Sequence, residues 1–376
     1  MAIEIIKPKF HFQRPLVIVF VVLAVIFGLS RWQLSTYVIT PGTATNVPPL
    51  IKVDALQTNQ HPDHIMLVDV YLSQLSAWGW LVSQFQSHQE FVTINELVQP
   101  GISVNQLEAQ GFLQMQDAKQ AAEVSALRAM GWKIPLRPSG SIITGVFNNS
   151  PAAKAGLHVG DEVVRIDSTP IKNSCDLLLA VAKLPAKTLI SAEVKKVKIS
   201  TTGVLTWQAA SVVRLTSAGV AKNQSKDSCG GVVVSRKSYI GVSSEDGIYS
   251  SLPAKFKIDT KYIGGPSAGL AMTLSLIDKL NGASLTGHVP IAVTGTMDLY
   301  GNVGDVGGVA EKTVAVSRTN AKYFIVPKIE VSVARANAGP GLQIIGVDTL
   351  QQALAVLRHI GGGPIQPLTQ PVSAKN

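Results

Sequence analysis

Apolar residues are distributed along this chain as one long hydrophobic stretch followed by many short periodic segments. Residues 16–29 (LVIVFVVLAVIFGL) are apolar or glycine without interruption. Beyond them the spacing of apolar residues predicts helices at 105–130, 175–184, 268–280 and 309–318. Strands are predicted at 64–73, 141–147, 188–199, 206–215, 231–234, 255–260, 289–294, 323–326 and 343–347. This mixture of elements indicates an α+β fold.

The hydrophobic stretch near the N-terminus predicts a membrane helix over residues 15–34. Basic residues precede it (Lys7, Lys9 and Arg14), and positive charge usually stays on the cytoplasmic side. We therefore expect residues 1–14 in the cytoplasm and the body of the protein outside the cell. Fourteen apolar residues are also within the range of a signal peptide, so the pattern alone leaves an anchor and a cleaved signal open.

Composition narrows the choice of partners. The chain has 376 residues, of which 46% are hydrophobic and 15% charged, which suits a membrane segment. The net charge is +9, but no basic stripe is interleaved with aromatic residues, so nucleic acid is not an expected partner. The two cysteines, Cys175 and Cys229, have no zinc-ligand spacing, and no metal is expected. The sequence permits a disulfide between them but favours two unpaired residues.

The glycine-rich stretch at residues 262–269 (YIGGPSAG) places Ser267 at the mouth of the helix predicted for 268–280. A helix N-terminus offers unpaired N–H groups and partial positive charge, which suit a developing oxyanion. Glycines such as Gly265 leave room for a substrate backbone. Alone, this stretch is equally compatible with a capped helix after a glycine-rich turn.

A second stretch, residues 294–312 (TGTMDLYGNVGDVGGVAEK), leads to Lys312. On the helix predicted for 309–318, Lys312 shares a face with Val309 and Val316, so we expect it to point inward. Glu311 and Arg318 fall on the opposite face, where we expect solvent. Burial lowers a lysine's pKa and thereby provides a general base for a serine nucleophile. A lysine that snorkels to the surface is the alternative.

GGPSAG, followed 45 residues later by the lysine of GGVAEK, resembles the proteolytic domain of Lon-type proteases. The resemblance implies a Ser–Lys dyad, with Ser267 as nucleophile and Lys312 as base. It also implies that Thr294 orients the lysine and that Gly265 belongs to the oxyanion region. The chain departs from the family where an acidic residue usually follows the threonine by two positions, since Thr296 stands there. The Asp-Gly that usually precedes the serine motif is replaced by two glycines.

Residues 131–200 resemble a PDZ domain of the kind found with bacterial proteases. The runs SPAAKAGL and GDEVVRID carry the resemblance. Such domains bind a peptide as an added strand beside a helix. We expect the groove between the strand at 141–147 and the helix at 175–184. A PDZ fold with a purely structural role is the alternative.

Two other enzyme classes fit poorly. GPSAG matches G-x-S-x-G, and Asp348 and His359 follow in the order of an α/β-hydrolase, but residues 259–265 are polar and glycine-rich where that fold needs an apolar strand. No S-x-x-K motif of penicillin-recognising enzymes occurs. The chain also has no G-x-x-x-x-G-K-[ST] loop, so no nucleotide is expected.

The sequence thus predicts an ATP-independent serine endopeptidase without cofactors, anchored in the cell membrane and cleaving exported or membrane proteins that its PDZ domain selects. The expected regions are a basic segment (1–14), an anchor (15–34), a juxtamembrane region (35–130), the PDZ domain (131–200), the Lon-like proteolytic domain (201–360) and a flexible tail (361–376). The other hypothesis is a membrane-tethered PDZ adaptor with an inactive protease-like domain. The substrate and the oligomeric state are left open.

Overall fold

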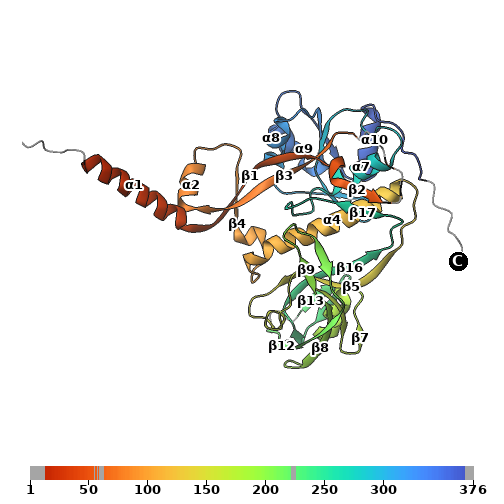
Figure 1. Ribbon diagram of the computed structural model, residues 1–376. Helices are drawn as coiled ribbons and strands as arrows, with labels where there is room; N and C mark the ends of the chain where they lie inside the picture. Colours follow the sequence, from red (N-terminus) through yellow and green to blue (C-terminus); the bar gives the residue numbers. More distant parts are fainter. Residues whose placement is uncertain (1–12, 55, 57, 59–62, 222–225, 369–376) are drawn as a thin grey trace, which may run out of the picture.

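The computed structural model describes residues 13–54, 56, 58, 63–221 and 226–368. A helix, α1 (Gln13–Arg31), projects from a body built around two sheets, and the long helix α4 (Leu107–Ala129) runs between them (Figure 1). Of the segment expected at 1–14, residues 1–12 lie outside the described part. A helix with the length and apolarity of a membrane span is not found among the described residues.

The first sheet has the strand order β22-β21-β18-β3-β1-β4. Its strands are β1 (Gln33–Asn46), β3 (Ile65–Ser76), β4 (Glu90–Thr93), β18 (Ile291–Val293), β21 (Tyr323–Pro327) and β22 (Gln343–Val347). β18 runs parallel to β3 and β21, whereas β1 runs antiparallel to β3 and β4. Strands from the expected juxtamembrane region therefore complete the sheet of the C-terminal region. The mixed α+β class is confirmed.

Helices cover both faces of this sheet. Alternate residues of β3 point to opposite faces, as the period of a strand requires. Ile65 and Leu67 join the core with α4, α7 (Gly269–Leu280) and α10 (Leu350–His359). Met66 and Val68 join the core with α8 (Val309–Ser317) and α9 (Val331–Ala336). Every residue of α7 except Lys279 is buried, so the helix that follows Ser267 is a fixed central element.

The second sheet has the order β11-β8-β6-β5-β16, with β7 (Thr169–Pro170) paired to β6. Its strands are β5 (Leu136–Val146), β6 (Glu162–Ile166), β8 (Leu189–Lys195), β11 (Ser211–Thr216) and β16 (Val242–Ser250), and α6 (Ser174–Ala182) packs on its core. β5 lies between β6 and β16, so the strand predicted as the groove edge has no open edge, and that prediction is wrong. The open edge on this side of the sheet belongs to β16, and β11 forms the opposite edge. The sheet also includes β11 and β16, which lie beyond residue 200, the C-terminal bound predicted for the PDZ domain.

Short elements lie between these helices and strands along the chain. They are η1 (Pro48–Leu50), β2 (Ile51–Asp54), α2 (Ala77–Ser83), α3 (Ile94–Leu97), η2 (Val104–Gln106), α5 (Pro151–Lys154), β9 (Val197–Ile199), β10 (Leu205–Trp207), β12 (Ala218–Gly219), β13 (Lys226–Cys229), β14 (Val232–Ser235), β15 (Ser238–Tyr239), β17 (Lys255–Ile258), β19 (Thr296–Met297), β20 (Val303–Gly304) and η4 (Lys328–Glu330).

Cys175 at the start of α6 and Cys229 in β13 form a disulfide, with Cα atoms 5.4 Å apart. The expectation of two unpaired cysteines is therefore wrong. The bridge ties the hairpin of β13 and β14 to α6. The two cysteines are separated by 54 residues, so the local pattern carried no information about their approach.

Part of the expected flexible tail is held on the body. Gly363 N–H donates to the carbonyl of Ser284 (2.8 Å), and Leu368 N–H donates to the carbonyl of Met130 (3.1 Å). Ile365 and Leu368 also pack on the core beneath α7 and α10. The prediction of a mobile segment is thus wrong for residues 361–368. It was based on glycine and proline content, which does not show whether a segment packs against distant parts of the chain. Residues 369–376 lie outside the described part.

Candidate active site

The helix that carries Lys312 packs directly on the β1–β3 ribbon. α8 begins after Gly308, whose φ of 66° is in the left-handed region that favours glycine. A Cβ at Gly308 would lie 3.1 Å from side-chain atoms of Ile39 and of Val70, so the close approach also favours glycine. Lys312 is consequently covered on all sides and only 2% exposed.

Burial lowers the pKa of Lys312 to about 8, because the ammonium form loses its hydration. The carboxylates of Glu330 and Asp69 oppose this shift by favouring the charged form. At pH 7 about a tenth of the Lys312 side chains are therefore in the neutral amine form, which can accept a proton, and this fraction rises as the pH approaches 8. The inward orientation that the helix pattern predicted for Lys312 agrees with this burial.

Thr294 connects Lys312 to the backbone of Ser267. Lys312 Nζ donates a hydrogen bond to Thr294 Oγ1 (3.4 Å), and this hydroxyl donates to the carbonyl of Ser267 (3.3 Å). The Gly295 N–H donates to the same carbonyl (3.0 Å). Thr294 is fully buried and directly follows β18, so the sheet fixes its position. The structure thus brings three residues together that the sequence placed in one site.

Ser267 lies in the turn that leads into α7 and is half-buried. The buried helix behind it directs its positive end toward this turn. Close packing fixes the start of α7, because a Cβ on Gly269 would come within 2.7 Å of the Met297 backbone nitrogen. A nucleophile in this position is partly accessible and held by a rigid support.

Gly265 has a φ of 87°, while a Cβ on it would meet no atom within 4 Å. Backbone conformation, rather than lack of space, therefore requires glycine here. The Gly265 N–H donates to the carbonyl of Gly111 in α4 (2.7 Å). Its amide is thus engaged, and a role in binding an oxyanion would require this bond to open.

Sequence reasoning missed both acidic neighbours of Lys312. Glu330 accepts a hydrogen bond from the Val306 N–H (2.8 Å) in the loop before α8. Asp69 accepts hydrogen bonds from the Thr43 hydroxyl (3.1 and 3.2 Å) on β1. The one available signal was Asp69 itself, an acid inside the otherwise apolar run IMLVDV.

Glu311 is only 3% exposed, so the expectation that it is solvated is wrong. Its carboxyl pKa is raised by burial, and the neighbouring Glu90 adds to the shift while His88 opposes it. Arg318, which was expected on the same face, is exposed.

The α/β-hydrolase interpretation gains no support from the positions of its two other candidate residues. Asp348 is exposed and pairs with Lys328 (3.6 Å), and His359 is exposed at the end of α10.

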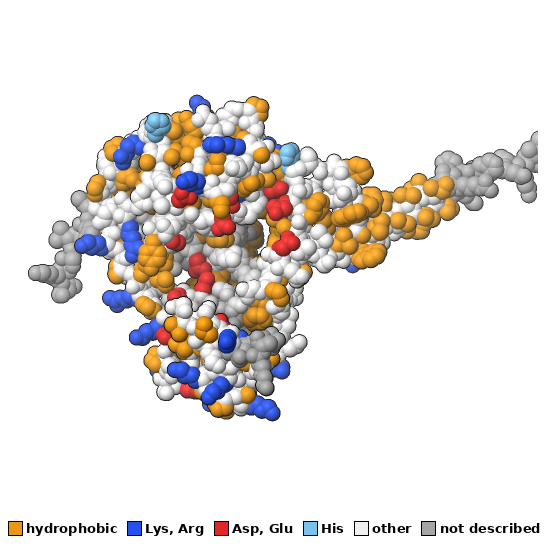
Figure 2. Space-filling model, turned by 180° about the vertical axis from the view of Figure 1, so that it is seen from behind, with side chains coloured by type: hydrophobic (Ala, Val, Ile, Leu, Met, Phe, Trp, Pro, Cys, Tyr) orange, Lys and Arg blue, Asp and Glu red, His pale blue; other side chains and the backbone are white. Residues whose placement is uncertain are grey.

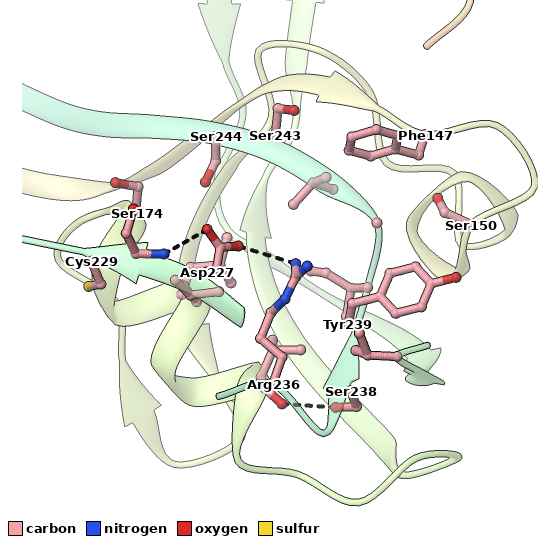
Figure 3. Close-up of a pocket in the computed structure, with 18 of the residues that line it drawn as sticks. Phe147, Ser150, Ser174, Asp227, Cys229, Arg236, Ser238, Tyr239, Ser243 and Ser244 are labelled. Atoms are coloured by element: carbon pink, nitrogen blue, oxygen red, sulfur yellow. Dashed lines mark hydrogen bonds and ion pairs between the residues drawn. The ribbon is translucent and has the colours of Figure 1, made fainter. Parts of the chain in front are cut away.

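The second sheet carries a groove of about 1130 Å³ between the open edge of β16 and α6 (Figure 3). Leu178 lines it from α6, and the chain from Tyr239 to Ser244 lines the opposite wall. The hairpin of β13 and β14 adds a third wall, where Asp227 and Arg236 form an ion pair (3.2 Å).

Among the described residues, no group of three His, Cys, Asp or Glu side chains is arranged to hold a metal ion.

Two family models match the chain. The Lon protease (S16) C-terminal proteolytic domain matches residues 260–357, and the PDZ domain matches residues 101–199. The chain is 35% identical over 107 residues to a Lon protease from Azospirillum brasilense, covering 28% of this chain and 13% of that protein. It is 35% identical over 114 residues to a Lon protease from Azorhizobium caulinodans, covering 29% and 13%. The chain thus spans only a small part of these relatives.

A crystal structure of the PDZ domain of the SdrC-like protein from Listeria monocytogenes is also similar. It has 16% sequence identity and a TM-score of 0.19, and the match covers 28% of this chain and 87% of that one. Ser267, Thr294 and Lys312 all lie within the residues that match the Lon proteolytic domain. The chain therefore carries a Lon-type (S16) proteolytic domain, a serine protease domain with a Ser–Lys dyad, together with a PDZ domain.

Proposed function

We propose that the protein is an ATP-independent serine endopeptidase in which Ser267 is the nucleophile and Lys312 the general base. The observation that carries this proposal is the hydrogen-bonded path from buried Lys312 through Thr294 to the backbone of Ser267. The chain has no phosphate-binding loop of the G-x-x-x-x-G-K-[ST] type. Without powered unfolding, its substrates are exposed loops and already unfolded segments.

The reaction proceeds by nucleophilic catalysis. The neutral amine of Lys312 accepts the proton of the Ser267 hydroxyl as the serine oxygen adds to the peptide carbonyl. The positive end of α7 stabilises the oxyanion that forms. Collapse of this intermediate breaks the C–N bond and leaves an acyl-enzyme, while Lys312 returns its proton to the departing amine. Water then hydrolyses the ester by the same proton transfers.

The pH dependence of cleavage follows from the lowered pKa of Lys312. Since only the neutral amine accepts a proton, we expect kcat/KM to rise with pH and level off above about 8. Glu330→Gln removes a negative charge that favours the ammonium form, so the midpoint should move to lower pH. The measurement is cleavage of a fluorogenic peptide between pH 5 and 10. An unchanged midpoint in Glu330→Gln would mean that another group controls the profile.

The PDZ domain supplies substrate selection in this proposal. A peptide added to the open edge of β16 would place side chains against α6, in the groove that Leu178 lines. Most of the backbone of β5 is already paired, so peptide pairing is assigned to β16 alone. The groove lies beside the second sheet, whereas Ser267 precedes α7 and Lys312 lies on α8, two helices that pack on the first sheet. Peptide capture and peptide cleavage can therefore be tested independently.

Leu178→Asp should impair capture of long substrates, because the aspartate would bury an unpaired charge when a peptide docks. We expect slower cleavage of β-casein and nearly unchanged cleavage of a fluorogenic hexapeptide. Val212→Asp, on the exposed face of β11 at the other edge of the sheet, is the matched control. If Leu178→Asp is folded by circular dichroism and cleaves both substrates at the wild-type rates, the PDZ domain is a spacer.

The proposal places the body outside the cell, anchored by α1. Its apolar side chains from Leu16 to Val25 are exposed, and basic residues precede them in the sequence. The disulfide between Cys175 and Cys229 fits an oxidising compartment. A lipid bilayer would cover the apolar surface of α1 that the body leaves open.

Topology can be tested with a reporter fused after Asn376. Alkaline phosphatase in that position should be active, because it folds only outside the cytoplasm, whereas a β-galactosidase fusion should be inactive. N-terminal sequencing should also recover the residues that precede α1. A soluble form that begins near Arg31 would instead show that the segment is a cleaved signal peptide.

The direct test of the proposed activity is β-casein cleavage by the purified full chain, compared with Ser267→Ala. Cleavage that requires Ser267 supports the endopeptidase. A folded chain that binds peptides and cleaves neither casein nor itself would support the adaptor hypothesis.

A further inference from the structure

An uncharged, aromatic surface lies at the base of α1. Residues 70–89 contain no Asp, Glu, Lys or Arg, although they form the end of β3, all of α2 and the turn after it. We call its exposed apolar side chains the aromatic shelf: Tyr71, Leu72, Trp78, Trp80, Leu81, Val82 and Phe85. Phe85 is 92% exposed and Trp80 is 45% exposed. The body of the protein leaves these side chains open.

α2 is held in a defined orientation despite this exposure. Ser76 caps the helix by accepting a hydrogen bond from the Gly79 N–H (3.0 Å). The Ser83 hydroxyl donates to the carbonyl of Trp80 at the other end (2.7 Å). The apolar side chains therefore stand on a formed helix, and such an arrangement in water indicates a partner surface.

The aromatic shelf is continuous with the apolar surface of α1. The Ala77 N–H donates to the carbonyl of Trp32 (2.9 Å), which joins the start of α2 to the chain just after α1. Gln33 at the start of β1 pairs with Ser76. Trp32 is itself 66% exposed. Hydrophobic side chains gather along the projecting helix and at its base (Figure 2).

We propose that the aromatic shelf lies in the headgroup region of the bilayer that α1 enters, as a second, interfacial contact with lipid. This inference rests on the membrane anchor proposed above. Tryptophan and tyrosine prefer the boundary between water and hydrocarbon, because one end of each ring is apolar and the other can form hydrogen bonds. The lack of charge over residues 70–89 suits partial immersion, and continuity with α1 favours lipid over a second copy of the chain.

The β1–β3 ribbon then fixes the height of the dyad above the membrane. α2, which carries most of the shelf, begins after Ser76 at the end of β3, and Tyr71 and Leu72 of the shelf lie on β3 itself. Val70 on the same strand packs against Gly308 at the start of α8. Six residues of strand span about 20 Å. The catalytic lysine is therefore held a short, fixed distance from the lipid surface. Peptide bonds close to the membrane, such as those in exported segments still attached to it, are the class of substrate that this arrangement favours.

Tryptophan fluorescence of the full chain in phosphatidylcholine–phosphatidylglycerol vesicles tests the lipid contact. Lipids brominated near the top of the acyl chain should quench the emission. The quenched fraction should fall clearly in the Trp78→Phe/Trp80→Phe variant, which keeps the shelf apolar. Trp132→Phe is the control, because that residue is partly buried and packs against the core of the body. Equal quenching in the wild type and the double variant would overturn the proposal.

A functional comparison uses Trp78→Ser/Trp80→Ser/Phe85→Ser and one casein-derived peptide, either free or linked to vesicle lipid. Cleavage of the lipid-linked peptide should fall about tenfold through loss of orientation at the surface, while the free peptide is cut as before. Equal effects on both peptides would contradict a role in membrane orientation.

The possible outcomes distinguish a failure of the shelf proposal from a failure of the membrane-anchor proposal. If the wild-type chain is released from vesicles by alkaline carbonate, the anchor fails and the shelf proposal with it. If the chain stays bound but the shelf tryptophans are not quenched, the shelf proposal alone is wrong. If the wild type is a dimer in nanodiscs whose shelf tryptophans are not quenched, and the serine variant is a monomer, the shelf binds a second copy of the chain instead.

Discussion

Ser267→Ala, Lys312→Ala and Lys312→Arg should each reduce peptide cleavage by roughly 10⁴-fold or more, since nucleophile and base act as one unit. Lys312→Arg is the most informative of the three, because a guanidinium keeps the positive charge but does not deprotonate in proteins. The measurement is kcat/KM on a fluorogenic peptide at pH 8.5, where the Lys312 amine is largely neutral.

Lys328→Arg provides the matched control for this series. Lys328 is exposed and pairs with Asp348 at the surface, so the same substitution there should leave the rate unchanged. Near-ultraviolet circular dichroism and thermal unfolding establish that each variant remains folded. Substantial activity in any folded dyad variant would remove that residue from the catalytic role assigned to it.

Thr294→Val should lower kcat by about 10²-fold with little change in KM, because the hydroxyl positions Lys312 without contacting bound substrate. Valine has nearly the same shape as threonine, so the packing after β18 is kept while both hydrogen bonds are lost. The buried lysine then loses its hydrogen-bond acceptor at Thr294.

Thr294→Ser separates the hydroxyl from the methyl group. Serine restores the oxygen that accepts from Lys312 and donates to the Ser267 carbonyl, so most of the activity should return. If valine and serine reduced kcat equally, the methyl group, and hence packing, would account for the effect instead of the hydrogen-bonded path.

Local patterns predicted the parts of the site that depend on single helices. The spacing of Val309, Lys312 and Val316 placed the lysine on the buried face of α8, as observed. The same reasoning failed for Glu311, because residues far away in sequence, including Glu90 of β4 and His88, lie near its side chain. A helical period identifies the most apolar face but does not show whether a second face is also covered.

Long-range strand pairing accounts for the other misses. β16 occupies the edge of β5 although a long segment of chain separates the two strands. The strands of the N-terminal region join the protease sheet through β3 and β18 in the same way. A strand pattern defines which residues face inward, whereas the order of strands depends on contacts that no local window contains.

Acylation of the chain by a peptide β-lactone tests the central claim most directly, because the reagent leaves a stable ester on the nucleophile that opens it. Tandem mass spectrometry should locate the adduct on Ser267, with a rate that rises through about pH 8 and is lost in Lys312→Ala. An adduct on another residue, or one that forms on Ser267 equally fast without Lys312, would contradict the dyad.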